Sequence, residues 1–439
     1  MWSYRFKMLR QRVGPPPTVA DRNAWYLSLE VAFASILSAA AAFNSTYVIR
    51  LGASNTVIGL MSSIPSLEAM LLYIPMAAFL EGRKHYMPWM VWSLFASRIV
   101  YLFIAFLPLL LFKGLGNVTA ALLIFATVPS VLFSVAWNPM FSDVVPARTR
   151  ASVVSVRSIL SSAVVAPLIY LAGLWLDSRQ DSFPRNYQWL FLVGFIGGAI
   201  SVYLVSRIRT PEKAVPLKTE KRKATLHDML GLSMLKRSPQ FARLTVNTFL
   251  VSAGSWMVGP LYTILYVRQL GASDSWIGAT STLSNIGAVA GYWIGQRIVK
   301  KIGENRGLRF TVPVNITWPL LVAIVSSLTT AKVSLTIVLI GGFLQNVISP
   351  LWSLSHTMIW MSRLPDEGKM TATAVYNTIM NVGAFILPLV GVALSDVIGI
   401  PGTLLIGAAM NAVGVLMFYV HPVSLRVEEP EPDVEPQGA

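Results

Sequence analysis

The residues Tyr47–Gly59 read YVIRLGASNTVIG, and the residues Tyr266–Gly278 read YVRQLGASDSWIG. Eight of the thirteen positions are identical, and every identity has the same separation of 219 residues. In both stretches the Gly and Ser of the LGAS sequence favour a short loop. We expect Ser54 and Ser273 to cap the helix that follows this loop.

The same separation recurs beyond this stretch. It pairs Pro146 with Pro365, and it pairs Asp177 with Asp396. An offset that persists from Tyr47 to Asp177 is hard to reach by chance, so the chain is predicted to contain two copies of one unit. Repeats of the same orientation fit an axis along the membrane normal, with a binding site between the halves.

Composition places both copies in a membrane. Of 439 residues, 54% are apolar and 13% are charged, whereas soluble proteins carry ~25% charged residues. Twelve membrane helices of ~20 residues need ~240 residues, which is close to the apolar content. Cysteine is absent, which excludes disulfides, thiolate metal sites and cysteine nucleophiles.

The apolar residues fall into twelve segments that are each long enough to span a bilayer as a helix. They do not alternate with polar residues, as strands of a membrane barrel would. The predicted spans are 25–48, 57–80, 88–112, 118–141, 152–176, 188–206, 243–267, 275–299, 310–329, 333–361, 371–394 and 402–420.

Lys and Arg predict the orientation of these spans and account for the net charge of +15. With the N-terminus inside, the cytoplasmic segments hold 26 of the 35 basic residues and the outer loops hold six. This bias favours two cytoplasmic termini in the cell membrane, and it removes the need for a nucleic-acid partner. The predicted domains are a cytoplasmic arm (1–26), two six-helix bundles (27–206 and 243–420), a basic cytoplasmic linker (207–242) and an acidic disordered tail (421–439).

Six plus six helices, a basic linker and a parallel half-repeat resemble the major facilitator superfamily of transporters. Two loops add to the resemblance: Gly82, Arg83 and Lys84 match the end of that family's motif between spans two and three, and Pro146 with Arg150 matches its Pro-x-x-x-Arg turn. Phe79 and Leu80 replace the motif's Asp and Arg. The resemblance implies that Gly82, Arg83, Lys84 and Arg150 form a cytoplasmic gate. The alternative is that Arg83 and Lys84 serve only the charge bias.

Charged residues inside spans are costly and require a reason. Glu68 and Arg98 lie near the middle of spans two and three, and Glu30 and Arg157 lie at similar depth in spans one and five. Either acid could carry a proton, since a carboxyl at low dielectric can be neutral or charged. Alternatively, Glu68–Arg98 or Glu30–Arg157 forms a fixed ion pair, or an arginine binds an anionic substrate.

The second half contributes amides and aromatic rings to a predicted cavity. Each amide could instead join helices by hydrogen bonds. Trp137–Asn138–Pro139 is expected to interrupt span four. The cavity candidates are Trp137, Asn138, Trp256, Asn285, Asn346, Trp352 and Asn381.

No nucleotide-binding loop, metal-ligand cluster or catalytic triad appears in the sequence, and no metal, cofactor or enzymatic activity is expected. We predict an all-α integral membrane protein of twelve helices in two bundles related by a pseudo-two-fold axis. It should be a monomeric secondary transporter of a small solute that works by rocker-switch alternating access, with protons as a candidate coupling ion. Alternatives are a membrane scaffold that has lost transport and a membrane-embedded enzyme.

Overall fold

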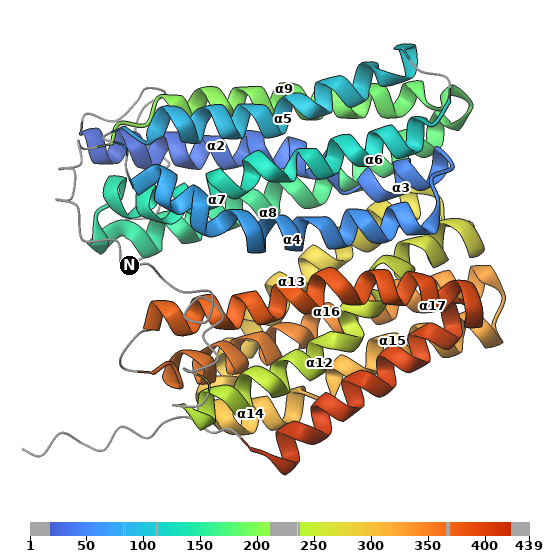
Figure 1. The fold of residues 1–439 in the computed structure, drawn as a ribbon. Helices are drawn as coiled ribbons and strands as arrows, with labels where there is room; N and C mark the ends of the chain where they lie inside the picture. Colours follow the sequence, from blue (N-terminus) through green and yellow to red (C-terminus); the bar gives the residue numbers. More distant parts are fainter. Residues whose placement is uncertain are drawn as a thin grey trace, which may run out of the picture. The chain divides into compact units, whose positions relative to one another are not determined.

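A computed structural model describes residues 18–81, 83, 85–110, 113–210, 235, 238–365 and 369–422. Most of the predicted arm, linker and tail therefore lies outside the described residues. The described residues are almost entirely helical (Figure 1). The helices are α2 (Val19–Ala41), α3 (Asn44–Arg50), α4 (Asn55–Glu81), α5 (Met87–Leu110), α6 (Leu115–Phe125), α7 (Thr127–Val144), α8 (Ala147–Ser178), η1 (Gln180–Ser182), α9 (Arg185–Ser206), α12 (Pro239–Ile264), η2 (Leu265–Gln269), α13 (Asp274–Ile302), α14 (Glu304–Thr311), α15 (Val314–Leu328), α16 (Ala331–Ser362) and α17 (Lys369–Val420).

Ten segments of the described chain are long and apolar enough to cross a membrane. One of them, Val375–Val420, contains two helices that meet at Gly399, where φ is 76°. Helix α13 has 29 residues and is more polar than those ten, but its length suffices for a span. The structure therefore fits the predicted twelve spans.

The two LGAS loops have the same geometry, as the repeat predicts. Gly52 and Gly271 both adopt positive φ angles, of 81° and 64°, which glycine adopts without a steric cost. The hydroxyl of Ser54 accepts a hydrogen bond from the Val57 amide, and that of Ser273 accepts one from the Trp276 amide. The predicted serine caps are confirmed.

Two predicted spans are divided at positions that the sequence did not indicate. The first separates into α2 and α3, and the fourth separates into α6 and α7 at Ala126. The expectation that Pro139 interrupts span four is wrong, because α7 continues through it. Proline removes one backbone donor, but neighbouring helices and hydroxyl groups can satisfy the freed carbonyl in a membrane helix.

The chain forms two compact units. Unit 1 contains 1–57, 71–219 and 273–282, and unit 2 contains 58–70, 220–272 and 283–439. Each unit thus draws most of its helices from one half of the chain and a short segment from the other. In unit 1 this segment is the start of α13, where Gly173 of α8 approaches the Asp274 carbonyl so closely that a Cβ would lie 2.6 Å from it.

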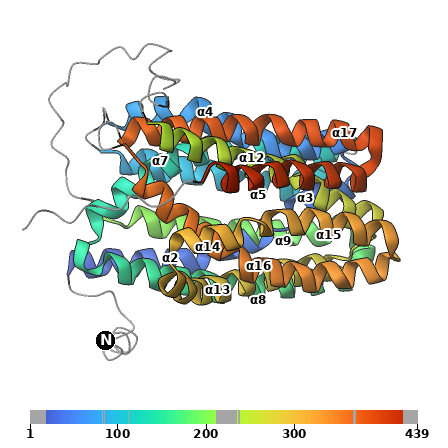
Figure 2. The same ribbon diagram turned by 90° about the horizontal axis from the view of Figure 1, so that it is seen from below.

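Small residues also bring the helices of each unit together. In unit 1, Gly194, Gly197 and Gly198 of α9 face α2, and a Cβ on Gly197 would lie 2.7 Å from Ile36. In unit 2, α12 and α17 lie side by side (Figure 2), and Gly254 of α12 touches the Gly407 carbonyl of α17. Close backbone contact of this kind is typical of helices that pack inside a bilayer.

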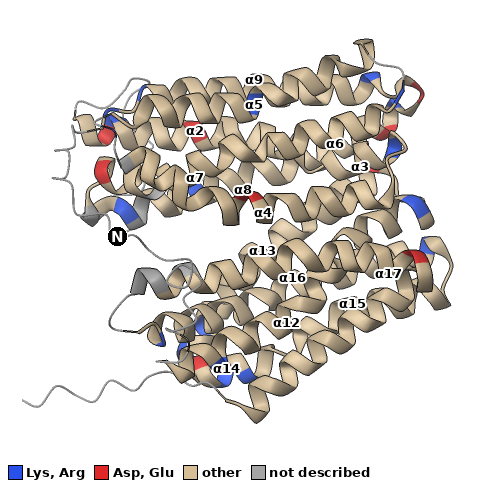
Figure 3. Ribbon diagram, in the orientation of Figure 1, with Lys and Arg blue, Asp and Glu red and all other residues tan. Residues whose placement is uncertain are grey.

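Charged residues gather at the ends of the helices (Figure 3). Along the middle of the helices the ribbon is mostly uncharged, with isolated acidic positions on α2 and α4 and a basic position on α5. This distribution agrees with a multi-pass membrane protein, and the exceptions locate the candidate site.

Candidate functional site

Glu30 lies at the centre of a buried charged cluster in unit 1. Its residue is 3% exposed. Its Oε2 atom is 2.9 Å from Nη2 of Arg157, and its Oε1 atom is 3.8 Å from Nη2 of Arg98. The hydroxyl of Ser201 donates a 2.7 Å hydrogen bond to the same Oε1 atom. We call Glu30, Arg98, Arg157 and Ser201 the charged centre.

Arg98 reaches this centre through a space that a glycine leaves open. Its Nη1 atom donates a 2.7 Å hydrogen bond to the Gly198 carbonyl. A Cβ on Gly198 would lie 3.2 Å from the side chain of Arg98, so a larger residue would press against the arginine. A buried guanidinium is thereby paired with both a carboxylate and a carbonyl, as a charge in a low-dielectric interior requires.

Arg157 is anchored on three sides. Besides Glu30, it donates to the Leu27 carbonyl on α2. Its guanidinium lies 4.8 Å from the centre of the Trp137 ring, within the range of a cation–π contact. Trp137 itself packs against Phe133 and Phe141. The predicted cavity residue Trp137 therefore supports the charged centre.

The charged centre connects four helices, because Glu30 comes from α2, Arg98 from α5, Arg157 from α8 and Ser201 from α9. The predicted Glu30–Arg157 contact is present, and Arg98 joins Glu30. The sequence placed Arg98 near mid-depth and placed Glu30 and Arg157 nearer the cytoplasm, but it gave no sign of Ser201 or Gly198. With two guanidinium groups and one carboxylate, the centre carries one excess positive charge.

A second buried carboxylate of unit 1 is Asp274, the first residue of α13. Asp274 is fully buried. Its Oδ1 atom is 3.0 Å from Nη2 of Arg50 and accepts a 2.6 Å hydrogen bond from the Tyr187 hydroxyl. Its Oδ2 atom has no hydrogen-bond partner among the residues that the structure describes. We call Arg50, Asp177, Tyr187 and Asp274 the α13 docking site.

Asp177 caps the first turn of α13 from a different helix. Its two carboxylate oxygens accept 2.8 Å hydrogen bonds from the backbone amides of Asp274 and Ser275. These amides have no acceptor within their own helix, because they lie at its N-terminus. Negative charge is favourable there. Helix α8 thus supplies the cap that the sequence around α13 only partly provides.

Burial raises the pKa of Asp274 above its ordinary value, and the negative charge of Asp177 acts in the same direction. The Tyr187 hydrogen bond and Arg50 oppose this shift without cancelling it. Sequence reasoning missed the docking site, because Arg50 counted only as an outer-loop charge. The one available signal was the pairing of Asp177 with Asp396 at the repeat offset.

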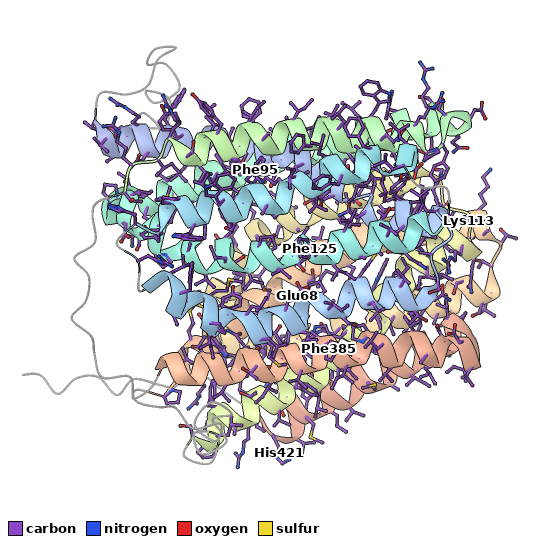
Figure 4. All side chains as sticks on the ribbon, turned by 45° about the horizontal axis from the view of Figure 1, so that its top comes forward. Glu68, Phe95, Lys113, Phe125, Phe385 and His421 are labelled. Atoms are coloured by element: carbon purple, nitrogen blue, oxygen red, sulfur yellow. The ribbon has the colours of Figure 1, made fainter. Side chains whose placement is uncertain are left out.

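Glu68 lies on α4 at the fourteenth of its 27 residues, which is the middle of the helix. Figure 4 labels this residue on α4. Its side chain is half-buried. The segment 58–70 that carries Glu68 belongs to unit 2, whereas Arg98 belongs to unit 1 and pairs with Glu30.

The candidate cavity residues of unit 2 have varied surroundings. Asn346 donates hydrogen bonds to the Ser284 hydroxyl and the Gly342 carbonyl, and therefore joins α16 to α13. The rings of Trp256 and Phe249 lie against Gly383. A Cβ on this glycine would lie 2.6 Å from the Phe249 ring. Two further amides, Asn285 on α13 and Asn381 on α17, are half-buried.

Trp352 packs against other aromatic rings and the apolar core of unit 2. Its ring packs against Phe418, with 5.6 Å between ring centres, and next to the His356 ring. The His356 Nε2 atom is 2.8 Å from the Thr248 hydroxyl. Trp352 also borders the apolar core of this unit, so its contacts are those of a packing residue.

The two predicted gate residues whose side chains the structure describes, Arg83 and Arg150, contact the ends of adjacent helices. Arg150 donates to the carbonyls of Ser142 and Val145 at the C-terminal end of α7, where positive charge is favourable. Arg83 lies 4.7 Å from the ring centre of Phe79 and 5.1 Å from that of Trp89. Gly82, Lys84 and the side chain of Asn138 lie outside the described residues.

A carboxylate and a phenol connect the start of α5 to the end of α7, close in sequence to these gate residues. The hydroxyl of Tyr86 donates a 2.9 Å hydrogen bond to Asp143. Burial and this bond raise the pKa of Tyr86, which therefore stays protonated as a donor. Within the described part of the chain, no group of three or more His, Cys, Asp or Glu side chains could bind a metal ion.

Comparison with known proteins identifies the family. A sequence model of the Major Facilitator Superfamily matches residues 27–359, which is more than half of the chain. The chain belongs to the Major Facilitator Superfamily. It is accordingly a secondary transporter, and the comparisons give no support to a scaffold without transport. A search of curated protein sequences finds no match.

Solved structures of Major Facilitator Superfamily proteins share the fold. A bacterial homologue of the iron transporter ferroportin in an inward-facing state has a TM-score of 0.70 and 12% identity, with 91% of this chain and 98% of that chain covered. The nucleoside transporter NupG has a TM-score of 0.62 and 12% identity, with 91% and 98% covered. A single-residue variant of the E. coli fucose:proton symporter FucP has a TM-score of 0.57 and 12% identity, with 91% and 98% covered.

Proposed function

We propose that this transporter moves a small, uncharged polar solute across the cell membrane and couples its movement to that of a proton bound by Glu68. The observation that carries the proposal is the position of Glu68, a half-buried carboxyl at the middle of an apolar membrane helix. An ionisable group at this depth is costly and marks a functional site by default. The charge bias supports a cytoplasmic position for both termini, and the proposal requires no catalytic step.

Glu30 is the weaker candidate for proton binding. Arg157 occupies one of its carboxylate oxygens, and Ser201 and Arg98 occupy the other. A proton would have to displace one of these partners and leave a buried guanidinium without its counter-charge. The charged centre is better suited to fix four helices of unit 1 as one body.

The same contacts argue against an anionic solute at Arg98. Its guanidinium already donates to the Gly198 carbonyl and pairs with Glu30, and the residue is buried. The candidate cavity residues of unit 2 are instead amides and indoles, which bind neutral polar groups. Nucleosides and sugars have this chemistry, and two of the similar structures are those of a nucleoside transporter and a fucose:proton symporter.

The test is proton movement in proteoliposomes that contain a pH-sensitive dye, with the membrane potential clamped. Nucleosides and neutral sugars are added one at a time, and a solute of one class should change the internal pH. Glu68→Gln should abolish this change but retain exchange of radiolabelled solute for unlabelled solute, because exchange needs no net proton transfer. Glu304→Gln is the matched control at a helix end and should leave both unchanged.

Two results would overturn the proposal. Undiminished proton movement in Glu68→Gln would remove this residue from coupling. Absence of uptake and exchange for every nucleoside and sugar, with protein that unfolds cooperatively, would show that the solute belongs to another chemical class.

A further inference from the structure

Two arginines of unit 2 border a surface crevice. The crevice has a volume of about 450 Å³ and is lined by Arg306, Arg309, Phe310 and Tyr419. Both arginines are exposed. Neither forms an ion pair with a carboxylate in the part of the chain that the structure describes. The crevice therefore has two positive charges and no internal counter-charge.

The packing of α14 fixes the position of these arginines. Leu308 and Val312 lie in the apolar core of unit 2, and Gly307 lies against Ser355 of α16. The opposite side of α14 leaves Phe310 73% exposed. The Tyr419 hydroxyl donates a 2.6 Å hydrogen bond to the Arg309 carbonyl, which ties α14 to the end of α17.

The crevice lies at the level where a bilayer meets water. Helix α14 begins the candidate span Glu304–Leu328, and Tyr419 lies at the end of the candidate span Val375–Val420. Aromatic and basic side chains at span ends are typical of the headgroup level of a membrane. This placement holds for either orientation of the chain, because both spans end at the crevice.

An apolar strip leads away from the crevice along α17. Val413, Leu416 and Val420 are all exposed, and their spacing of three and four residues places them on one face of the helix. Exposed Phe310 and Tyr419 add ring surface beside the arginines. The surface thus combines a site for a phosphate with an apolar path next to it.

We propose that this crevice binds the headgroup of an anionic phospholipid. The phosphate lies between Arg306 and Arg309, which suit its geometry, and an acyl chain lies along Val413, Leu416 and Val420. Exposed Lys300 and Lys301 at the end of α13 precede α14 in the chain and add positive charge close to it in sequence. The apolar strip and the aromatic lining favour a lipid over a soluble phosphate.

The test is native mass spectrometry of the full-length protein in neutral detergent, titrated with phosphatidylglycerol or with phosphatidylcholine of the same chains. In the variant Arg306→Gln/Arg309→Gln, the dissociation constant for phosphatidylglycerol should rise about 25-fold, since each arginine near the surface contributes about five-fold. Phosphatidylcholine should bind all variants equally and weakly.

Two variants provide matched controls. Arg207→Gln removes an exposed arginine that stacks on Tyr203 at the end of α9, and should leave phosphatidylglycerol binding unchanged. Arg306→Lys/Arg309→Lys keeps the charge and should retain most of the binding. This pair of lysines also tests the site if the glutamine variant folds poorly.

Three results would overturn the proposal. The first is that Arg306→Gln/Arg309→Gln binds phosphatidylglycerol as tightly as the unmodified protein does. The second is that Arg207→Gln loses as much affinity for phosphatidylglycerol as Arg306→Gln/Arg309→Gln does. The third is that millimolar inorganic phosphate displaces phosphatidylglycerol completely, which would identify a site for a soluble anion.

Discussion

The two buried carboxylates of unit 1 differ in how completely their partners neutralise them. Glu30 has partners on both oxygens and faces two arginines. Asp274 has one arginine and one tyrosine on the same oxygen, while its Oδ2 atom has no hydrogen bond within the described part of the chain. A carboxylate that is fully paired must stay charged for its partners to remain satisfied. A carboxylate that is partly paired can lose its charge at a smaller cost.

The largest expected effect is at the charged centre. Glu30→Gln should lower the free energy of unfolding by about 3–5 kcal/mol, because it leaves two buried guanidinium groups without a counter-charge. Titration with a denaturing detergent, followed by tryptophan fluorescence, measures this change. Glu304→Gln, at the start of α14, is the control and should change stability by less than about 0.5 kcal/mol. A Glu30→Gln protein as stable as this control would show that the charged centre is not a structural support.

A smaller effect is expected where Asp177 caps α13. Asp177→Asn should cost about 1 kcal/mol, because the loss of an N-terminal cap has this size and the amide can accept only one of the two backbone bonds. Asp396→Asn is the matched variant, since Asp396 occupies the equivalent position 219 residues later and is exposed. The same denaturant titration compares the two variants. Equal losses would mean that the cap seen at Asp177 contributes nothing specific.

Asp274→Asn should have a smaller effect still, under about 1 kcal/mol at neutral pH. The raised pKa of Asp274 shows that burial outweighs the attraction of Arg50 for its charge, so a neutral side chain of the same shape loses little. The comparison with Glu30→Gln, measured by the same titration, is the sharpest test of the difference between the two carboxylates. A loss for Asp274→Asn as large as that for Glu30→Gln would contradict it.

The smallest expected effect is a dependence of the free energy of unfolding on pH, caused by Asp274. The folded pKa of Asp274 lies above the ordinary value of 3.8, so the folded state binds a proton more readily than the unfolded state. The burial of the charged form therefore costs stability at neutral pH, and this cost disappears as the pH falls through the folded pKa towards 3.8. The stability of the unmodified protein relative to Asp274→Asn should rise over this range, as measured by unfolding titrations at several pH values. A difference that is flat or falls on acidification would show that the sign is wrong.

Some local features of the fold were predictable from sequence. The Ser54 and Ser273 caps followed from the LGAS sequence, because a cap depends on residues three positions apart. The break between α6 and α7 was not predictable, since Ala126 has no breaker character and Pro139 lies within a continuous helix. Proline weakens a helix by the backbone bond that it removes and by the clash of its ring with the preceding turn, and the surrounding helices decide whether that loss is tolerated.

The sequence by itself determined the class of the protein, the approximate positions of its spans and its two-fold repeat. These features depend on the free-energy cost of moving a backbone and its side chains into a bilayer. That cost depends on the residues of each segment and not on its neighbours. Only the tertiary structure decided that Glu30 pairs with Arg157, 127 residues away, that Gly198 makes room for Arg98, and that Asp177 caps α13. Such contacts depend on which helix faces meet, and an apolar membrane helix carries little sign of its facing partner, because lipid and protein interior are almost equally apolar.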